Sequence, residues 1–205
     1  MEATSDTRSK PARSETAERL LDAAERLLVE VGHAGISTRR LAAEAGANQG
    51  LVHYYFGSID ELFVQVLERF TERLVARQRE MYGTDAPFIE KWRTAWRFQE
   101  DDLRGGYSKI WLELQALSWS RPELWPRVAK VNAEWRSVLR DAFRRAAVEY
   151  GLDEERFPVE ALVALTMAFN QGVGLERLAG IDDGHGELLD WIERWLQSLE
   201  GRRSA

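Results

Sequence analysis

The chain has 205 residues, a hydrophobic content of 44% and a formal net charge of −6, which allow one large or two small domains with a packed core. It has no cysteine, so disulfides and thiolate metal sites are excluded. No apolar run approaches the roughly 20 residues that cross a bilayer, and the N-terminus lacks the apolar region of a signal peptide. We therefore expect a soluble cytoplasmic protein with no membrane partner.

The N-terminal segment, residues 1–13, is polar and carries Arg8, Lys10 and Arg13 with no acidic residue between them. We interpret it as a flexible basic arm. Ser14 is predicted to cap a helix whose apolar residues recur at helical spacing until the glycine that follows Val31.

Two short helices joined by a tight turn are predicted between Ile36 and Phe56. Ser37 is a good N-cap for the first, Gly46 lacks a Cβ where the chain leaves that helix, and Asn48 can cap the second. A helix-turn-helix places the start of its second helix against base edges in the major groove, while its first helix crosses the phosphate backbone. The stretch therefore predicts a DNA-binding element.

The residues of this element that are expected to face outward are assigned contacts to bases or to phosphates. Gln49 can make a bidentate contact to adenine and Leu51 can contact a thymine methyl group, with His53 facing base edges beside them. Hydroxyl and guanidinium groups would hold phosphates, namely those of Ser37, Thr38, Arg39, Tyr54 and Tyr55. The predicted DNA-binding residues are Ser37, Thr38, Arg39, Gln49, Gly50, Leu51, His53, Tyr54 and Tyr55.

The same stretch resembles the signature of the TetR (tetracycline-repressor-like) family of bacterial transcription regulators, over about residues 17–63. The shared residues are Ser37, Leu41-Ala42, Ala45-Gly46, Gly50 and His53-Tyr54-Tyr55-Phe56. One position departs from the family pattern, because Ile59 stands where the family usually has a phosphate-binding Lys. The departure implies that affinity for DNA depends more on the basic arm.

The rest of the chain predicts further helices and no strand, since no stretch alternates with period two between turn residues. Ser58 with Glu61, and Ser120 with Glu123, form candidate capping boxes at helix starts. The predicted class is all-α, with a three-helix DNA-binding domain at 14–57 and a larger helical domain for effector binding and dimerisation at 58–205.

The last two helices carry more apolar surface than one core face needs, and their glycines allow another backbone to approach closely. Such a pair can form a four-helix interface with its copy, and an intrachain helical hairpin is the alternative. The resemblance implies a homodimer through these helices. The predicted interface residues are Gly172, Leu175, Leu188, Trp191, Ile192 and Trp195.

Eight tryptophans are present, six of them in the middle helices. Large aromatic walls with few polar groups suit a small apolar or aromatic ligand, although aromatic residues at helical spacing also form ordinary cores. The resemblance implies that a pocket for an unidentified small-molecule effector exists. The predicted ligand-binding residues are Trp92, Trp96, Trp111, Gln115, Trp135 and Asn170.

No catalytic residues, metal site or cofactor are predicted. The acidic and histidine side chains of the loop from Asp182 to Glu187 are interpreted as a solvated turn, and His33 as a surface or packing residue. The hypothesis is a homodimeric regulator, not an enzyme, that binds a palindromic double-stranded DNA operator as a repressor and is released by an effector. The alternative is a helical interaction protein that binds a protein partner through its Trp-rich half.

Overall fold

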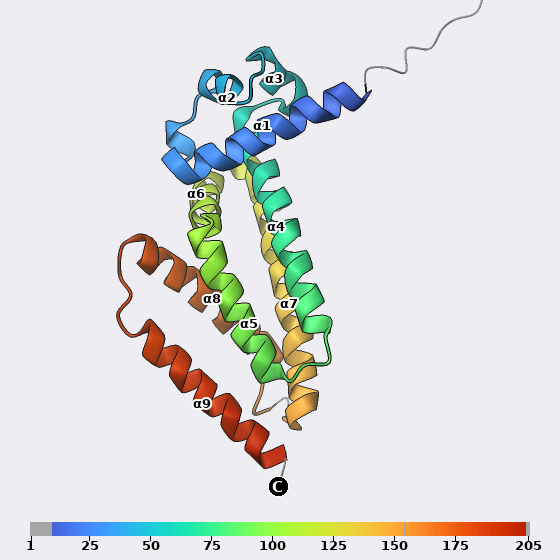
Figure 1. Ribbon diagram of the computed structural model, residues 1–205, viewed down its shortest axis with the longest axis vertical. Helices are drawn as coiled ribbons and strands as arrows, with labels where there is room; N and C mark the ends of the chain where they lie inside the picture. The colour runs from blue at the N-terminus through green and yellow to red at the C-terminus, as the bar shows by residue number, and fades with distance from the viewer. Residues whose placement is uncertain (1–9, 154, 204–205) are drawn as a thin grey trace, which may run out of the picture. The chain divides into compact units, whose positions relative to one another are not determined.

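A computed structural model describes residues 10–153 and 155–203, and every regular element in these ranges is a helix (Figure 1), as predicted. Two single turns of 3-10 helix, His33–Gly35 and Pro122–Leu124, separate longer elements. The α-helices are α1 (Lys10–Val31), α2 (Thr38–Glu44), α3 (Gly50–Phe56), α4 (Ile59–Gly83), α5 (Phe88–Arg104), α6 (Tyr107–Ser120), α7 (Trp125–Tyr150), α8 (Val159–Leu178) and α9 (His185–Arg203).

The chain forms two compact units, and neither is continuous in sequence. The first contains residues up to Phe70 together with Glu113–Val128, and the second contains Thr71–Leu112 together with the residues from Ala129 onwards. Helices α4, α6 and α7 therefore each supply residues to both units. The predicted DNA-binding domain, residues 14–57, lies within the first unit but does not include the unit's second segment, residues 113–128.

The first unit is built on the apolar face of α1. Leu20, Ala24 and Leu28 on that face are buried, as are Leu41 of α2 and Val52 of α3, and α1 contacts α2 while α2 contacts α3. Burial of this helical stripe follows the predicted periodicity. Helix α1 begins at Lys10, four residues before the predicted cap at Ser14, and residues 1–9 of the predicted arm lie outside the described part of the chain.

The two predicted capping boxes behave differently. At Ser58 the hydroxyl accepts a hydrogen bond from the backbone N–H of Glu61 at 3.1 Å, so the serine half of this box is confirmed, while the Glu61 carboxylate pairs with Arg127. At Ser120 the prediction is wrong, because Ser120 is the last residue of α6 and a separate 3-10 turn follows. Pro122 explains the difference, since proline disfavours helical backbone at the residue before it and Arg121 is accordingly extended in φ.

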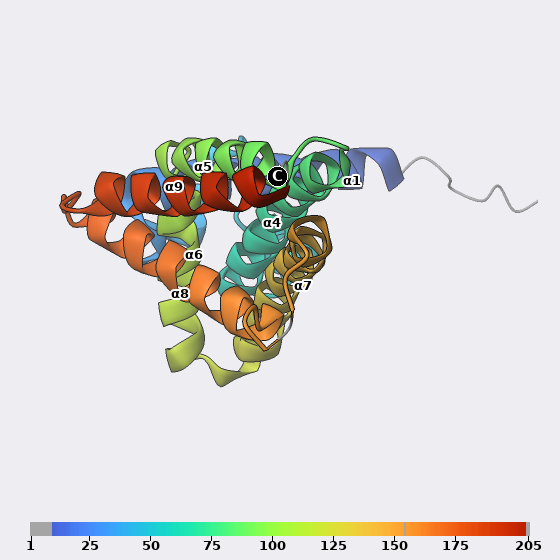
Figure 2. The same cartoon turned by 90° about the horizontal axis from the view of Figure 1, so that it is seen from below.

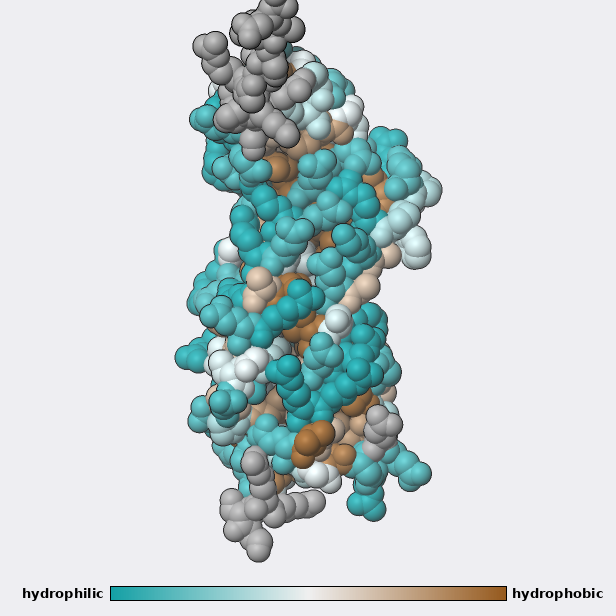
Figure 3. All heavy atoms as spheres, turned by 90° about the vertical axis from the view of Figure 1, so that its right-hand side faces the viewer, coloured by the Kyte–Doolittle hydropathy of each residue, from teal (hydrophilic) through white to brown (hydrophobic). Residues whose placement is uncertain are grey.

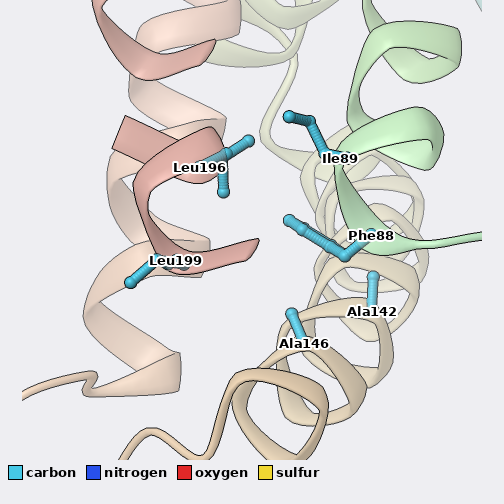
Figure 4. Packing of buried hydrophobic residues seen from close by; sticks show 6 residues of the cluster. All are labelled: Phe88, Ile89, Ala142, Ala146, Leu196 and Leu199. Atoms are coloured by element: carbon cyan, nitrogen blue, oxygen red, sulfur yellow. The ribbon is translucent and has the colours of Figure 1, made fainter. Parts of the chain in front are cut away.

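The second unit has its own core, in which α5, α7 and α9 meet. Figure 4 shows Phe88 and Ile89 of α5, Leu196 of α9 and Ala142 of α7 gathered in this cluster, to which Leu199 and Ala146 also belong. Helix α9 lies alongside α5 (Figure 2). Small alanines on α7 allow the larger side chains of α5 and α9 to pack closely.

The surface is largely hydrophilic on the face shown in Figure 3, where hydrophobic residues emerge only in small separate areas. Within the described residues, no helix is both long enough and apolar enough to span a bilayer.

We expect Leu196→Ala to destabilise the protein by about 2–5 kcal/mol, because Leu196 is buried and its truncation leaves a cavity among helices that relax only partly. Chemical denaturation monitored by circular dichroism measures the change. Val148→Ala on α7, where the side chain is 84% exposed, is the control and should change stability by no more than about 0.5 kcal/mol.

Candidate functional site

The helix-turn-helix is formed by α2 and α3 and is fixed by local hydrogen bonds. The Ser37 hydroxyl accepts from the backbone N–H of Arg40 at 3.1 Å, and the Asn48 side-chain oxygen accepts from the N–H of Gly50 at 2.8 Å. The predicted cap at Ser37 is therefore present, and Asn48 binds the first N–H of α3 from one residue before the N-cap, which is Gln49. Gly46 has a φ of +58° in the turn between the helices, a conformation that favours glycine.

The two faces of this element differ in burial as predicted. Leu41, Ala42, Val52 and Phe56 are buried against the first unit. The nine residues predicted to contact DNA are all exposed or partly exposed: Ser37, Thr38, Arg39, Gln49, Gly50, Leu51, His53, Tyr54 and Tyr55. The structure thus brings the predicted DNA-binding residues to the solvent-facing side of one short element.

Two side chains on this face differ in their hydrogen bonding. The His53 Nδ1 atom lies 3.0 Å from the carbonyl oxygen of Gly57, so Nδ1 carries the donated proton and Nε2 is the ring nitrogen left for another partner. The Arg39 side chain, in the first turn of α2, forms no hydrogen bond or ion pair with the described residues. A guanidinium without a protein partner at that position suits a phosphate.

Glu113 of α6 anchors the loop that precedes α2. Its carboxylate accepts hydrogen bonds from the backbone N–H of His33 at 2.5 Å and from the Nδ1 atom of the same residue at 3.0 Å. Gly32, with a φ of +71°, packs so closely that a Cβ there would lie 2.5 Å from Oε1 of Glu113. His33 is thus one side of a specific contact, which the sequence did not reveal because its partner lies 80 residues away.

The beginning of α7 is attached to α4 by charged side chains of the first unit. Arg127 donates to both carboxylate oxygens of Glu68, at 2.8 and 2.5 Å, and also pairs with Glu61. These hydrogen bonds, together with the nearby negative charges, raise the pKa of Arg127 above its usual value. Arg121 pairs with Asp60 at 3.2 Å, so the second segment of the first unit, residues 113–128, is bound to the first segment at several points.

A cavity of about 490 Å³ lies within the second unit, with walls from α4 to α9. Its volume falls in the range of small-molecule sites. Five of the six predicted ligand-binding residues line it: Trp92, Trp96, Trp111, Trp135 and Asn170. The sixth, Gln115, does not line it and belongs to the first unit. Trp119 and Trp125, by contrast, are largely exposed and are not part of the walls.

The cavity wall contains polar groups that the sequence analysis missed. The Tyr107 hydroxyl accepts a hydrogen bond from Trp135 Nε1 at 2.9 Å and lies 3.1 Å from the Thr71 hydroxyl. Burial raises the pKa of Tyr107 to about 12. Asp102 accepts two hydrogen bonds from Arg77, at 2.7 and 2.8 Å. Burial raises the pKa of Asp102 above its usual range, although Arg77 acts in the opposite direction.

Residues predicted for self-association fall into two groups. Leu188, Trp191, Ile192 and Trp195 of α9 line the cavity, and Trp191 remains 60% exposed. Gly172 and Leu175 of α8 do not line it and are exposed. Helices α8 and α9 thus present uncovered apolar surface in the single chain, part of which borders the cavity.

The loop from Asp182 to Glu187 is not uniformly solvated, so that prediction is wrong for His185. Its side chain is buried, and its Nε2 atom lies 2.6 Å from a carboxylate oxygen of Glu176. Asp182 and Glu187 are exposed, as expected. Among the described residues, no group of three or more His, Cys, Asp or Glu side chains could hold a metal ion.

Comparisons with known proteins agree with this arrangement. Residues 20–66 match the family described as bacterial regulatory proteins, tetR family. An uncharacterised HTH-type transcriptional regulator of Haemophilus influenzae is 30% identical over 43% of this chain and 47% of its own length. The HTH-type transcriptional regulator BetI of Stenotrophomonas maltophilia is 29% identical over 56% of this chain and 60% of its own length. The chain thus matches only about half of the length of these curated relatives.

A solved structure resembles the whole fold. A transcriptional regulator from Saccharomonospora viridis, in complex with choline, has a TM-score of 0.73 and 21% sequence identity, and the match covers 90% of this chain and 95% of that chain. At this level of identity the likeness shows the all-helical fold alone.

Gly32→Ala should destabilise the first unit more than Gly46→Ala. Both substitutions place a side chain at positive φ, which costs roughly 1–2 kcal/mol, but only the Cβ at position 32 collides with a neighbour, the Glu113 carboxylate. Urea denaturation of the single variants and of Gly32→Ala/Glu113→Ala measures the difference. Equal effects of the two glycine variants, or simple additivity in the double variant, would contradict the contact.

Proposed function

We propose that this chain is a dimeric transcriptional regulator of the TetR family that binds a palindromic operator and represses by occluding a promoter. The match of residues 20–66 to that family and the likeness to BetI of Stenotrophomonas maltophilia support the proposal. A small apolar or aromatic effector bound in the second unit would release the regulator. A member of this family would have a regulatory role and not a catalytic one. It would act in the cytoplasm, where bacterial operators lie.

The observation that carries the DNA-binding proposal is the exposed face of α2 and α3. Gln49 and His53 are exposed and Leu51 is partly exposed at the start and middle of the second helix, the part that enters the major groove in a helix-turn-helix. Arg39 stands without a protein partner at the start of the first helix, and helix N-termini add backbone N–H donors for phosphate. We assign base contacts to Gln49, Leu51 and His53. Phosphate contacts are assigned to Ser37, Thr38, Arg39, Tyr54 and Tyr55.

The proposed dimer rests on the apolar surface of α8 and α9. Leu175, Leu178 and Trp191 are between 47% and 60% exposed, which is unusual for side chains of this size on two adjoining helices. Packing against the same helices of a second copy would bury them around a two-fold axis. A two-fold dimer would also supply the second reading helix that a palindromic operator demands.

The effector proposal rests on the cavity. Its walls are mostly aromatic and aliphatic with a few polar groups, the usual composition of a small-molecule site. The related fold from Saccharomonospora viridis holds choline, which supports a small molecule as the effector class here. Release would require the effector to bind more tightly to a state with lower affinity for the operator, because a ligand shifts an equilibrium only by its differential affinity.

The DNA-binding face is tested by selecting bound duplexes from a random pool and measuring the affinity of variants at several salt concentrations. We expect Gln49→Ala to lose about 1–3 kcal/mol of discrimination at one base pair in each half-site. Arg39→Ala should instead weaken binding to all sequences and lower the salt slope by about one per half-site. A uniform loss in Gln49→Ala would exclude the base-reading role.

The dimer interface is tested by Leu175→Asp, which places two charges in the proposed interface, one from each copy. We expect dissociation to monomers by sedimentation velocity, with unchanged helical content, because burying an unpaired carboxylate is strongly unfavourable. Val148→Asp is the matched control, since Val148 is exposed on α7 outside the proposed interface. A Leu175→Asp variant that remained dimeric would move the interface elsewhere.

A further inference from the structure

The charges of the cavity wall are one-sided. None of the described residues that line the cavity is Lys, Arg or His, and Asp102 is the acidic residue among them. The arginines beside the wall are held by carboxylates: Arg77 by Asp102, and Arg177 by Glu100. An anionic ligand would therefore find no positive side chain in the wall and would meet Asp102 instead.

The aromatic part of the wall favours a positive charge. Trp92, Trp96, Trp111 and Trp135 all line the cavity, as do Tyr107 and Trp195. The faces of aromatic rings attract cations, and the attraction is greater where water is excluded. A side chain of the wall already contacts a cation of the protein itself, since the Arg177 guanidinium lies 5.9 Å from the ring centre of Trp96.

One buried side chain in the wall lacks a hydrogen-bond donor. Gln78 of α4 lines the cavity and is only 7% exposed, and its Oε1 atom has no partner among the described residues. An amide oxygen left unpaired in the interior is unfavourable. The terminal torsion of glutamine is soft, so the oxygen can turn toward a donor in the cavity. Asp102 also has lone pairs beyond those that Arg77 occupies.

We propose that the cavity selects a protonated amine carried on an aromatic or aliphatic body, with its N–H groups directed at Gln78 and Asp102 and its charge against the tryptophan faces. This inference rests on the proposed function, in which the same cavity holds the effector. It narrows the effector class, because carboxylates and phosphates are excluded and a cation without N–H groups binds less well.

The test is isothermal titration calorimetry of the full chain with three probes that share one body: 4-phenylbutylamine, its N,N,N-trimethyl derivative, and 4-phenylbutyrate. We expect the amine to bind at least tenfold more tightly than the butyrate, and at least about threefold more tightly than the trimethylated cation. Comparable binding of the butyrate, or no binding of any probe, would overturn the proposal.

Variants locate the binding determinant. Gln78→Leu should weaken binding of the amine by about tenfold, as expected for loss of a hydrogen bond to a charged group, and should leave binding of the trimethylated cation nearly unchanged. Asn132→Leu is the matched control, because its Oδ1 atom is also buried without a partner but does not line the cavity. Should Gln78→Leu fail to fold, Gln78→Met serves the same purpose. Unchanged amine binding in the Gln78 variant would remove that residue's role and overturn the proposal.

Operator binding without a probe, measured on the same protein, separates the two levels of inference. Sequence-specific DNA binding in a protein that ignores all three probes would overturn the amine assignment and leave the proposed regulator intact. Amine binding with the expected selectivity, in a protein that enriches no DNA sequence, would support the cavity assignment and contradict the regulator.

Discussion

The contact between Glu113 and His33 fixes the loop between α1 and α2, and the placement of the helix-turn-helix depends on that loop. Gly32 turns the chain through positive φ after α1, and the next backbone N–H is bound by a carboxylate from α6. Hydrogen bonds to a charged acceptor are stronger than those between neutral groups, and the loop that they hold leads directly into α2. Trp111, two residues before Glu113 on the same continuous helix, lines the cavity. Under the proposed function, α6 is thus the segment through which an effector could bias the position of the reading element.

The distribution of charge bears on the DNA binding proposed for this acidic chain. The arginines that attach helices to one another are paired with carboxylates, as Arg69 is with Asp22 and Glu25, and Arg127 is with Glu68. Such pairs present little net positive charge to a polyanion. Arg39 has no such partner, and it lies where a phosphate is expected. Arg39 can therefore contribute to attraction of a phosphate at the helix-turn-helix without first breaking an ion pair.

Local chemistry made the helix-turn-helix predictable from sequence, because a cap involves residues two or three apart. Ser37, Gly46 and Asn48 act as their neighbours in the sequence suggest. The cavity was less predictable. Trp111 and Gln115 are four residues apart and share a face of α6, but the compact unit that contains the cavity ends on this helix at Leu112. That boundary has no local signal in the sequence. The contacts of Glu113 and Asp102 have none either, because the partners of these two residues lie 80 and 25 residues away.

Helix α9 places two proposed functions on the same side chains. Trp191 and Trp195 line the cavity, yet both are more than 40% exposed in the single chain, on the surface proposed for dimerisation. A ligand that changes the rotamer of either ring would change the surface offered to the second copy, and packing of that copy would restrict the rings that contact the ligand. Because linkage is reciprocal, any effect of the effector on dimer affinity must equal the effect of dimerisation on effector affinity. The cavity and the interface should therefore be regarded as one coupled site, so that a substitution at Trp191 or Trp195 cannot be assigned to either function from a single measurement.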